Sequence, residues 1–273
     1  LVLEPKTGRI LALAAVPTFD PNAFSKEKDF SVFLNPLVES RYELGSVIKP
    51  ITMAAGIEEK VVTPESTYRD TGEIRIGSYT IKNFDEKAYG VQTMTQVLEK
   101  SLNTGAVHVA RLLGQERHFS YLTQFGFGSK TGVDLPGENR GLLRRVENWT
   151  PVSVGSISMG QEIGVTPVQL TSAVSAIANG GLLVRPRAVR EIRRGLEAIP
   201  VPAPEPHRVI SPQTAATLRS MLEGVVLQGT GTLARLDGYT AAGKTGTAQK
   251  IDPATGSYSP TQHIASFVGF API

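Results

Sequence analysis

The chain has 273 residues and 41% of them are hydrophobic, which is enough to bury one large core or two smaller ones. Its 28 basic and 25 acidic residues nearly cancel to a net charge of +3, and no run of lysine and arginine indicates a nucleic acid partner. The chain has no cysteine, which excludes disulfide bonds, thiolate metal sites and cysteine nucleophiles.

The two ends of the sequence indicate a piece of a longer protein. The chain starts without Met inside the strand-like stretch LVLE and stops inside another, FVGFAPI. No apolar run approaches the ~20 residues of a membrane span, and no signal peptide opens the chain. We expect the chain to be cut at both ends, so a missing anchor says nothing about the parent protein.

The first half of the chain opens with a predicted β-hairpin over residues 1–14, where two apolar runs flank a Pro/Gly turn. Residues 45–59 are apolar on nearly every face, which is typical of a buried helix. Residues 60–90 are polar and irregular, with short strand-like pieces such as EIRIGSYTI. Residues 92–113 have a helical pattern that is interrupted at 101–105.

The second half contains two helices with clear start signals. One begins at Thr166-Pro167 and stops at Asn179-Gly180-Gly181. A Pro-rich connector follows at 199–206, and the next helix begins at Ser211-Pro212 and ends near Gly229.

Two predicted strands close the chain, 239–250 and 263–271, joined by the turn-rich residues 252–260. Because strands lie at both ends of the chain and helices lie between them, we predict an α+β fold. The terminal strands would join in one antiparallel sheet. In the expected division, 1–45 and 205–273 contain the sheet, and about 46–204 is mostly helical.

The stretch GYTAAGKTGT fits two patterns that imply different chemistry. Residues 238–245 fit the phosphate-binding loop G-x-x-x-x-G-K-[ST], whereas Lys244-Thr245-Gly246 fits the K-T-G element of penicillin-recognising serine enzymes. A phosphate loop needs a buried strand before it and a helix after it. GTGTLARLD precedes the lysine and GTAQKIDPATG follows it, so the context argues against phosphate binding.

The K-T-G tripeptide alone is weak, because it also occurs at Lys6 and Lys130, where turn chemistry explains it. Only Lys244 lies in a strand candidate made of small residues, which a peptide could approach closely. Thr247 adds a further hydroxyl there.

The pattern S-x-x-K occurs twice, and its context separates the two copies. Ser25 to Lys28 is highly charged and reads as solvated surface, whereas Ser46 and Lys49 open the buried helix one turn apart. Burial lowers the pKa of a lysine towards neutrality, which makes it a usable general base. A capping serine and an outward-pointing lysine remain an alternative interpretation.

A third element, Ser101-Leu102-Asn103, lies in the break between two helical stretches. Such residues are ordinarily turn or cap residues, but in a loop a hydroxyl can relay a proton and an amide can hold a carbonyl. The order and separation of Ser46/Lys49, Ser101/Asn103 and Lys244 make the combination specific.

Nearly the whole chain resembles a class B penicillin-binding protein, the monofunctional D,D-transpeptidase type, and it is closer to the division-associated type than to the elongation type. The resembling stretches are LVLEPKTGRILALAAVPTFDPN, ELGSVIKPITMAAGIE, LEKSLNTGAVHVARLLG, FGFGSKTGVDLPGENRG, SMGQEIGVTPVQL, ANGGLLVRP, AAGKTGTAQK and FVGFAP. The resemblance implies the fold shared by penicillin-binding proteins and serine β-lactamases, present here as a partial transpeptidase domain over 1–273.

The resemblance also implies a role for each motif residue. Ser46 matches the acylated nucleophile, Lys49 its base, Ser101 the hydroxyl that moves protons to the leaving group, and Asn103 the amide that binds the substrate backbone. Lys244 matches the strand lysine that supports this proton network, and Thr245, Gly246 and Thr247 match the substrate-binding strand, whose threonines bind the terminal carboxylate. The backbone N–H groups of Ser46 and Thr247 would form the oxyanion hole.

The implied reaction is peptidoglycan cross-linking through a Ser46 acyl-enzyme, with no metal or cofactor. The implied partners are stem peptides ending in D-Ala-D-Ala, β-lactams as covalent inhibitors, and cell-division membrane proteins bound through regions absent from this chain. The implied location is the extracytoplasmic face of the bacterial cytoplasmic membrane (the periplasm), with an anchor N-terminal to this chain.

Three rival functions stay open at this point. The same acyl-enzyme chemistry could use water as acceptor, as in a D,D-carboxypeptidase or β-lactamase. A penicillin- or muropeptide-sensing domain would be acylated once without turnover. The third rival is a P-loop NTPase.

Two departures from the family pattern bear on the fold. Leu44 replaces a proline common before Gly45-Ser46, which removes no chemistry. The family's sheet normally continues with another strand and a C-terminal helix after the point where this chain stops. We expect a sheet that is incomplete at its C-terminal end, with an unpaired edge, and poor stability and low activity for this chain alone.

Overall fold

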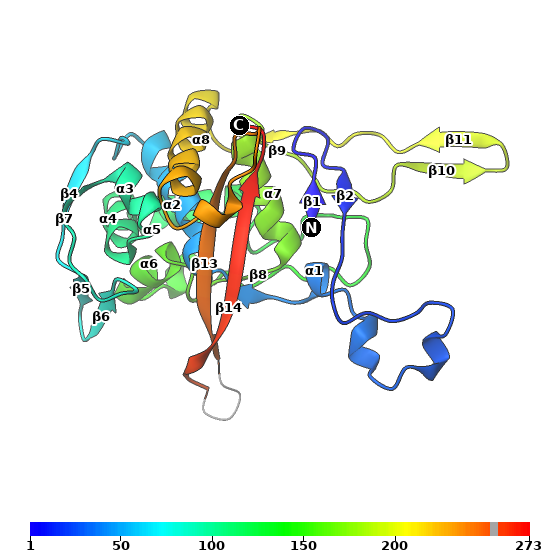
Figure 1. Ribbon diagram of the computed structural model, residues 1–273, viewed down its shortest axis with the longest axis horizontal. Helices are drawn as coiled ribbons and strands as arrows, with labels where there is room; N and C mark the ends of the chain where they lie inside the picture. The colour runs from blue at the N-terminus through cyan, green and yellow to red at the C-terminus, as the bar shows by residue number, and fades with distance from the viewer. Residues whose placement is uncertain (252–255) are drawn as a thin grey trace.

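Helix α2 (Lys49–Glu58) lies within the largest hydrophobic core of the protein. The computed structural model describes residues 1–251 and 256–273. The helices packed around α2 are α4 (Asn103–Leu113), α5 (Gln115–Gln124), α7 (Pro167–Ala178) and α8 (Pro212–Leu227) (Figure 1). Because these helices cover α2, its residues from Lys49 to Gly56 are all buried, which confirms the predicted buried helix.

The remaining helical segments are short. They are α1 (Pro36–Glu39), α3 (Met94–Glu99), α6 (Pro151–Ser158) and the 3-10 turns η1 (Phe24–Lys26), η2 (Phe30–Phe33), η3 (Gly45–Ile48), η4 (Val146–Asn148) and η5 (Thr232–Ala234).

Local sequence explains where the two long helices of the second half begin. Thr166 and Gln169 form a reciprocal capping box at the start of α7, and Ser211 caps α8 by accepting the N–H of Thr214. Both helices have a proline next to the cap, where its missing N–H costs nothing. Both predicted start signals are confirmed.

In the described part of the chain, every strand pairs antiparallel with a single neighbour strand. The pairs are β1 (Val2–Leu3) with β2 (Ile10–Ala12), β3 (Tyr42–Glu43) with β8 (Gly164–Val165), β4 (Thr67–Asp70) with β7 (Gly90–Thr93), β5 (Glu73–Ile76) with β6 (Tyr79–Lys82), β9 (Leu182–Leu183) with β12 (His207–Arg208), β10 (Glu191–Arg194) with β11 (Glu197–Pro200), and β13 (Ala242–Ile251) with β14 (Tyr258–Phe270).

The α+β class is confirmed, but the described ends of the chain do not join in one sheet as predicted. The hairpins β1–β2 and β13–β14 are separate two-stranded sheets. Helix α7 packs against both β1 and β14 and lies between the two hairpins in Figure 1. Neighbouring strands must lie about 4.8 Å apart to exchange hydrogen bonds. The two hairpins instead contact a shared helix at separate places.

Three boundaries differ from the prediction. Helix α4 already begins at Asn103, so the break after α3 is shorter than the expected 101–105. Strand β14 begins at Tyr258, inside the predicted turn 252–260, of which 252–255 lie outside the described residues. The expected connector 199–206 starts inside β11. Each difference lengthens an element, and for the two strands cross-strand pairing extends them beyond their local sequence signal.

Candidate active site

Ser46 lies in the 3-10 turn η3, which continues directly into α2. The turn that carries Ser46 is therefore a 3-10 turn and not part of the α-helix itself. In a 3-10 turn, side chains three residues apart lie one above the other, so Ser46 and Lys49 share an edge. Leu44, Val47 and Ile48 are fully buried and anchor the turn, whereas Ser46 is only half-buried at its mouth.

The Ser46 turn packs against strand β13 with no room for a side chain between them. A Cβ on Gly246 would lie 2.8 Å from Val47 Cγ1 and 3.0 Å from the Leu44 carbonyl oxygen. Gly45 has φ +56, and a Cβ there would lie 2.5 Å from the Thr247 carbonyl oxygen. Glycine at both positions therefore brings Ser46 next to residues 244–247.

Two lysines from different elements meet at the hydroxyl of Ser101. Lys49 Nζ lies 3.3 Å from Ser101 Oγ, and Lys244 Nζ lies 2.9 Å from the same atom. Lys49 also donates to the Ser101 carbonyl oxygen at 2.6 Å, and Lys244 to the Thr245 carbonyl oxygen at 3.1 Å. The predicted meeting of Lys49, Ser101 and Lys244 is present.

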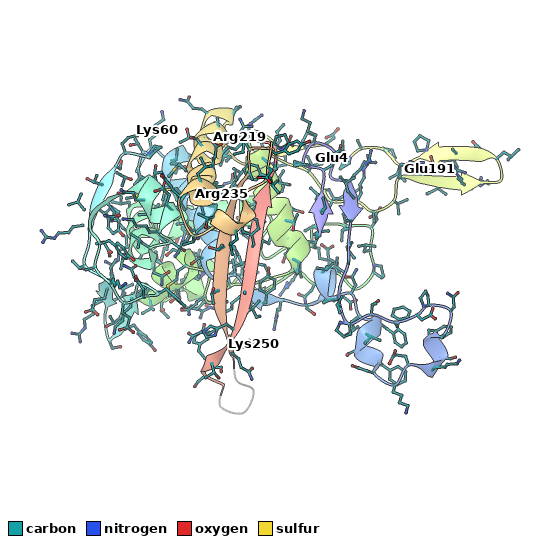
Figure 2. All side chains as sticks on the ribbon, in the orientation of Figure 1. Glu4, Lys60, Glu191, Arg219, Arg235 and Lys250 are labelled. Carbon is teal, nitrogen blue, oxygen red and sulfur yellow. The ribbon has the colours of Figure 1, made fainter. Side chains whose placement is uncertain are left out.

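Both lysines are buried, in contrast to surface lysines such as Lys60 and Lys250, which point outwards in Figure 2. Lys49 is 1% exposed and Lys244 is 0% exposed. Burial, and then the charge of Lys244, hold the pKa of Lys49 well below its usual value. Burial lowers the pKa of Lys244 to about 7. Burial therefore favours the neutral amine form of Lys49, which is the form that a general base needs.

Asn103, the first residue of α4, holds Lys49 from another side. Its Oδ1 accepts from Lys49 Nζ at 2.7 Å, and its Nδ2 donates to the Lys82 carbonyl oxygen at 2.8 Å. Ser101 precedes it with φ +60, a strained conformation for a residue other than glycine that is common at functional sites. The backbone at the break between α3 and α4 is thus shaped around the lysine.

The Ser46 hydroxyl itself makes no hydrogen bond to any residue that the structure describes. The side-chain N–H groups of Lys49 instead donate to the Ser101 carbonyl oxygen and to Asn103 Oδ1. A neutral amine has two N–H bonds and one lone pair. With both N–H bonds occupied, a neutral Lys49 keeps its lone pair for accepting a proton, and its third neighbour is the Ser101 hydroxyl at 3.3 Å.

These groups lie at a cleft of about 820 Å³. Among its lining residues are Ser46, Ser101, Asn103, Thr245, Gly246, Thr247 and the wall formed by Tyr79–Asp85 and Tyr89. Lys49 and Lys244 lie behind this lining and reach it through their hydrogen bonds. All eight predicted site residues are therefore at the cleft or bonded to it.

Thr230 is a cleft residue that the sequence prediction missed. Its hydroxyl lies 2.8 Å from Thr245 Oγ1 and 3.5 Å from Lys244 Nζ, and its N–H donates to the Glu99 carbonyl oxygen at 3.0 Å. The only sequence signal is the run Gly-Thr-Gly-Thr after α8, which reads as a helix stop. Its role depends on packing against β13.

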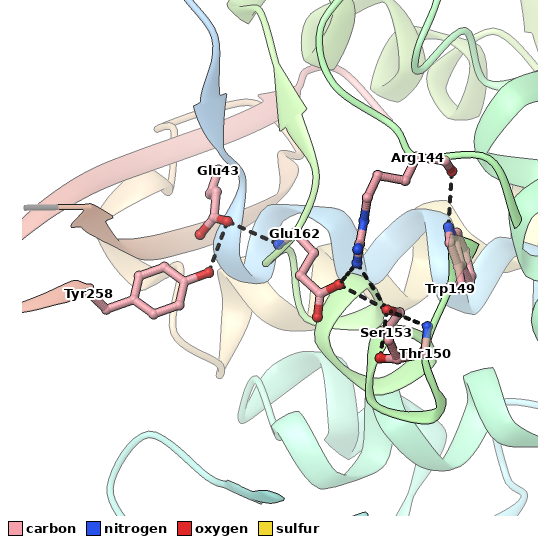
Figure 3. A network of polar contacts seen from close by, with 7 residues as sticks. All are labelled: Glu43, Arg144, Trp149, Thr150, Ser153, Glu162 and Tyr258. Carbon is pink, nitrogen blue, oxygen red and sulfur yellow. Dashed lines mark hydrogen bonds and ion pairs between the residues drawn. The ribbon is translucent and has the colours of Figure 1, made fainter. Parts of the chain in front are cut away.

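A second polar network fixes the Ser46 turn from outside the cleft (Figure 3). Glu43, three residues before Ser46, accepts the Glu162 N–H and the Tyr258 hydroxyl, both at 2.9 Å. Glu162 in turn accepts from Arg144 and from Ser153. Burial raises the pKa of Glu43, since its second carboxyl oxygen is buried without a partner among the described residues. The network joins the start of β14 to the Ser46 turn.

The competing motif copies lie elsewhere. The Lys6 copy of K-T-G is in the turn between β1 and β2, the Lys130 copy is in a loop, and Ser25 is exposed in η1. The P-loop prediction is wrong, because Lys244 lies in strand β13, which continues to Ile251, and the next described element is strand β14 rather than a helix.

Within residues 1–251 and 256–273, no cluster of three or more His, Cys, Asp or Glu side chains could hold a metal ion. No helix in the same ranges combines the length and the apolar character needed to cross a membrane.

Comparison with known proteins places this geometry in a family. The model of the penicillin-binding protein transpeptidase domain matches residues 1–273. Stage V sporulation protein D of Bacillus subtilis is 40% identical over all of this chain, and the Neisseria meningitidis protein named "Probable peptidoglycan D,D-transpeptidase PenA" is 31% identical over all of it. The chain spans 42% and 44% of the lengths of these two relatives.

Solved structures agree with the sequence comparison. Penicillin binding protein 3 from Mycobacterium tuberculosis, in complex with aztreonam, superposes with a TM-score of 0.93 at 37% identity. The match covers 99% of this chain and 62% of that chain.

Proposed function

This chain belongs to the family of penicillin-binding protein transpeptidase domains, and on that premise we propose that it cross-links peptidoglycan stem peptides through an acyl-enzyme on Ser46. The observation that carries the proposal is the Ser101 hydroxyl shared by two buried lysines behind the cleft that Ser46 lines. A water-exposed lysine pair would be charged and could not act as a base at neutral pH.

In the first step, Ser46 Oγ attacks the carbonyl carbon of the penultimate D-Ala, and its proton passes to the lone pair of Lys49. The N–H groups of Ser46 and Thr247 stabilise the oxyanion, which the close approach of Gly45 to Thr247 supports. The C–N bond to the terminal D-Ala then breaks. Its nitrogen takes a proton through Ser101, which both lysines contact.

In the second step, an amine of a neighbouring stem peptide attacks the Ser46 ester. The amine loses a proton to the same network, the C–O bond breaks, and Ser46 Oγ regains its proton. One peptide bond replaces the one that was broken, so the reaction needs no external energy source and no cofactor.

Substrate recognition uses the residues around this centre. The hydroxyls of Thr245 and Thr247 line the cleft beside Lys244, where they can bind the terminal carboxylate. Asn103 keeps one N–H of its amide free for a substrate carbonyl, since the other goes to Lys82. β-Lactams would acylate the same serine and block the cleft.

The experiment is intact-mass spectrometry of the full-length parent protein after benzylpenicillin, followed by peptide mapping, because low activity is expected of this chain alone. We expect one adduct on the peptide that contains Ser46, its loss in Ser46→Ala, and its retention in Ser25→Ala. The Ser25 variant is a matched control because Ser25 begins the other S-x-x-K copy. Absence of an adduct on the wild-type full-length protein, or an adduct elsewhere, would refute the proposal.

The motifs alone do not separate an amine acceptor from water, so a D,D-carboxypeptidase or β-lactamase is the second candidate function. A thioester substrate, turned over with and without an added D-amino acid, distinguishes them. Partition of the acyl group to the amino acid indicates transpeptidation, and hydrolysis alone indicates the second candidate. A stable adduct without any turnover indicates a penicillin-sensing domain.

We also propose that the parent protein works in cell division on the periplasmic face of the cytoplasmic membrane, with its membrane anchor and its division partners bound through regions outside this chain. The Caulobacter vibrioides relative named "Probable peptidoglycan D,D-transpeptidase FtsI" supports the extracytoplasmic part of this proposal, because peptidoglycan lies outside the cytoplasmic membrane.

A further inference from the structure

A buried carboxylate, Asp70 at the end of β4, lies at the centre of a hydrogen-bond hub away from the catalytic lysines. Asp70 accepts from Thr104 Oγ1 at 2.7 Å, from the N–H of Tyr89 at 2.9 Å and from the N–H of Gly72 at 3.0 Å. Asn83 Nδ2 donates to both of its oxygens, at 3.1 and 2.9 Å. The carboxylate thus ties together β4, the cleft wall and the start of α4.

Two of these partners, Asn83 and Thr104, are sequence neighbours of Lys82 and Asn103. Asn83 follows Lys82, whose carbonyl accepts from Asn103 Nδ2. Thr104 follows Asn103 itself, and its N–H donates to Asn83 Oδ1 at 3.3 Å. Asp70 therefore fixes both the acceptor that Asn103 uses and the backbone that carries Asn103.

The amide of Asn103 can face its two neighbours in only one way. Its nitrogen must point to the Lys82 carbonyl and its oxygen therefore to the Lys49 amine, since a flipped amide would oppose its oxygen to the carbonyl oxygen of Lys82, acceptor to acceptor. Without a fixed Lys82 carbonyl, the amide could rotate and Lys49 would lose an acceptor.

We propose that Asp70 is a positioning residue for acyl transfer, which acts through Asn83 and Thr104 to set the side-chain orientation of Asn103 and, through it, the direction of the Lys49 lone pair. The inference rests on the proposed function of Ser46 and Lys49, and it concerns residues that neither the motifs nor the cleft chemistry identified.

The expected effect of removing Asp70 has a defined sign. Asn103 Oδ1 accepts from Lys49 and favours its protonated form, so loss of this contact lowers the pKa of Lys49 further. The neutral base is then available at lower pH, and the acid limb of the pH–rate profile moves to lower pH. The rate at the plateau falls nevertheless, because the lone pair and the substrate amide contact are no longer oriented.

The test compares Asp70→Asn with Glu138→Gln in the second-order rate of acylation by benzylpenicillin between pH 5 and 9. Glu138 is a matched control because it also accepts two backbone N–H groups and one threonine hydroxyl, in the loop at Thr131 and Gly132, away from the cleft. We expect Asp70→Asn to lose on the order of tenfold to a hundredfold in rate and to show the shifted acid limb. Glu138→Gln should match the wild type.

A wild-type rate and acid limb in Asp70→Asn would overturn the inference, and so would an equal loss in both variants. If Asp70→Asn does not fold, Thr104→Val is the test, since it removes the hydrogen bond from the Thr104 hydroxyl to Asp70 and keeps the side-chain shape. A slower Thr104→Val supports the inference and an unchanged one overturns it. The pKa of Lys49 can be measured from the ¹³Cε chemical shift of labelled lysine and compared between variants even if none is acylated. This measurement distinguishes failure of the inference from failure of the proposed function.

Discussion

At the scale of single residues, the site depends on two amines that the fold removes from water. Desolvation favours the neutral form of Lys49 and brings the pKa of Lys244 to about 7. Ser101 Oγ connects them, so a proton can pass between the two side chains without leaving the protein interior. Such an arrangement reduces stability, because burying a charged lysine is unfavourable. The residues that make the site reactive should therefore destabilise the fold.

The variant Lys244→Met should show directly that the buried lysine needed for reactivity reduces the stability of the fold. The pKa of Lys244 is about 7 in the folded chain and 10.5 for an ordinary lysine, so between these values only the unfolded chain binds the proton. The free energy of unfolding of the wild type thus rises with pH from about 7 to about 10. In Lys244→Met we expect this slope to flatten and the stability at pH 7 to increase by about 1–4 kcal/mol, with acylation lost.

The measurement is thermal and urea unfolding at pH 7 and pH 9.5, with Lys250→Met as the control for an exposed lysine of the same strand. A Lys244→Met variant that is less stable than the wild type at pH 7, with an unchanged slope, would contradict the desolvation argument.

At the scale of elements, the position of Ser46 is set by the contact of turn η3 with strand β13. The turn η3 and strand β13 approach each other over Gly45 and Gly246, where no Cβ fits. The network of Glu43, Glu162 and Tyr258 anchors the same turn to the start of β14 (Figure 3). The distance between Ser46 and the 244–247 strand is set by these contacts, and the oxyanion hole needs that distance.

Gly246→Ala should impair the chemistry more than the fold. The added methyl group would lie 2.8 Å from both Val47 Cγ1 and Ser266 Oγ, so β13 must move away from the Ser46 turn. We expect a loss of about 1–3 kcal/mol in stability and on the order of a hundredfold in acylation rate, since small misplacements are costly in catalysis.

The matched control is Gly164→Ala, a strand glycine of β8 where an added Cβ meets nothing closer than 3.4 Å. Both variants are assayed for penicillin acylation and for urea unfolding. Equal acylation rates in the two variants would show that close packing at Gly246 is not needed.

At the scale of the whole molecule, the site lies between the helical core and the hairpin β13–β14, and other parts of the chain extend away from it (Figure 1). The hairpin β10–β11 projects from the body, with Glu191 at its base (Figure 2). The hairpin β5–β6 has the same strand lengths but contributes Tyr79–Lys82 to the cleft. The expected division into 1–45 with 205–273 and 46–204 stays a prediction, as does low stability of the chain alone.

These two hairpins allow a matched deletion experiment. Replacing 191–200 by a short Gly/Ser link should leave acylation by penicillin unchanged, because the Val201 N–H already bonds to the Arg190 carbonyl and the ends lie together. The same replacement of 73–82 should abolish acylation, since it removes the cleft wall and the carbonyl that holds Asn103. Loss of acylation in the first deletion would place the β10–β11 hairpin in the active structure.

Much of the architecture could be predicted because its signals are local. The apolar stretch at 45–59, the caps at Thr166 and Ser211 and the small-residue strand around Lys244 each act within one or two turns of chain. The pairing of the two chain ends was wrong, because strand partners depend on contacts between residues more than 200 positions apart. Thr230, Glu43 and Asp70 were missed because each becomes meaningful only through a distant partner.

The sequence by itself determined which side chains can react and that Ser46 and Lys49 lie one turn apart, since helical spacing is a property of the local backbone. Only the tertiary structure decided that burial lowers the pKa of Lys49, that Lys244 meets Ser101 from 143 residues away and that Asn103 has a fixed orientation. Desolvation and hydrogen bonding depend on which segments exclude water together, and that is settled by packing of the whole chain.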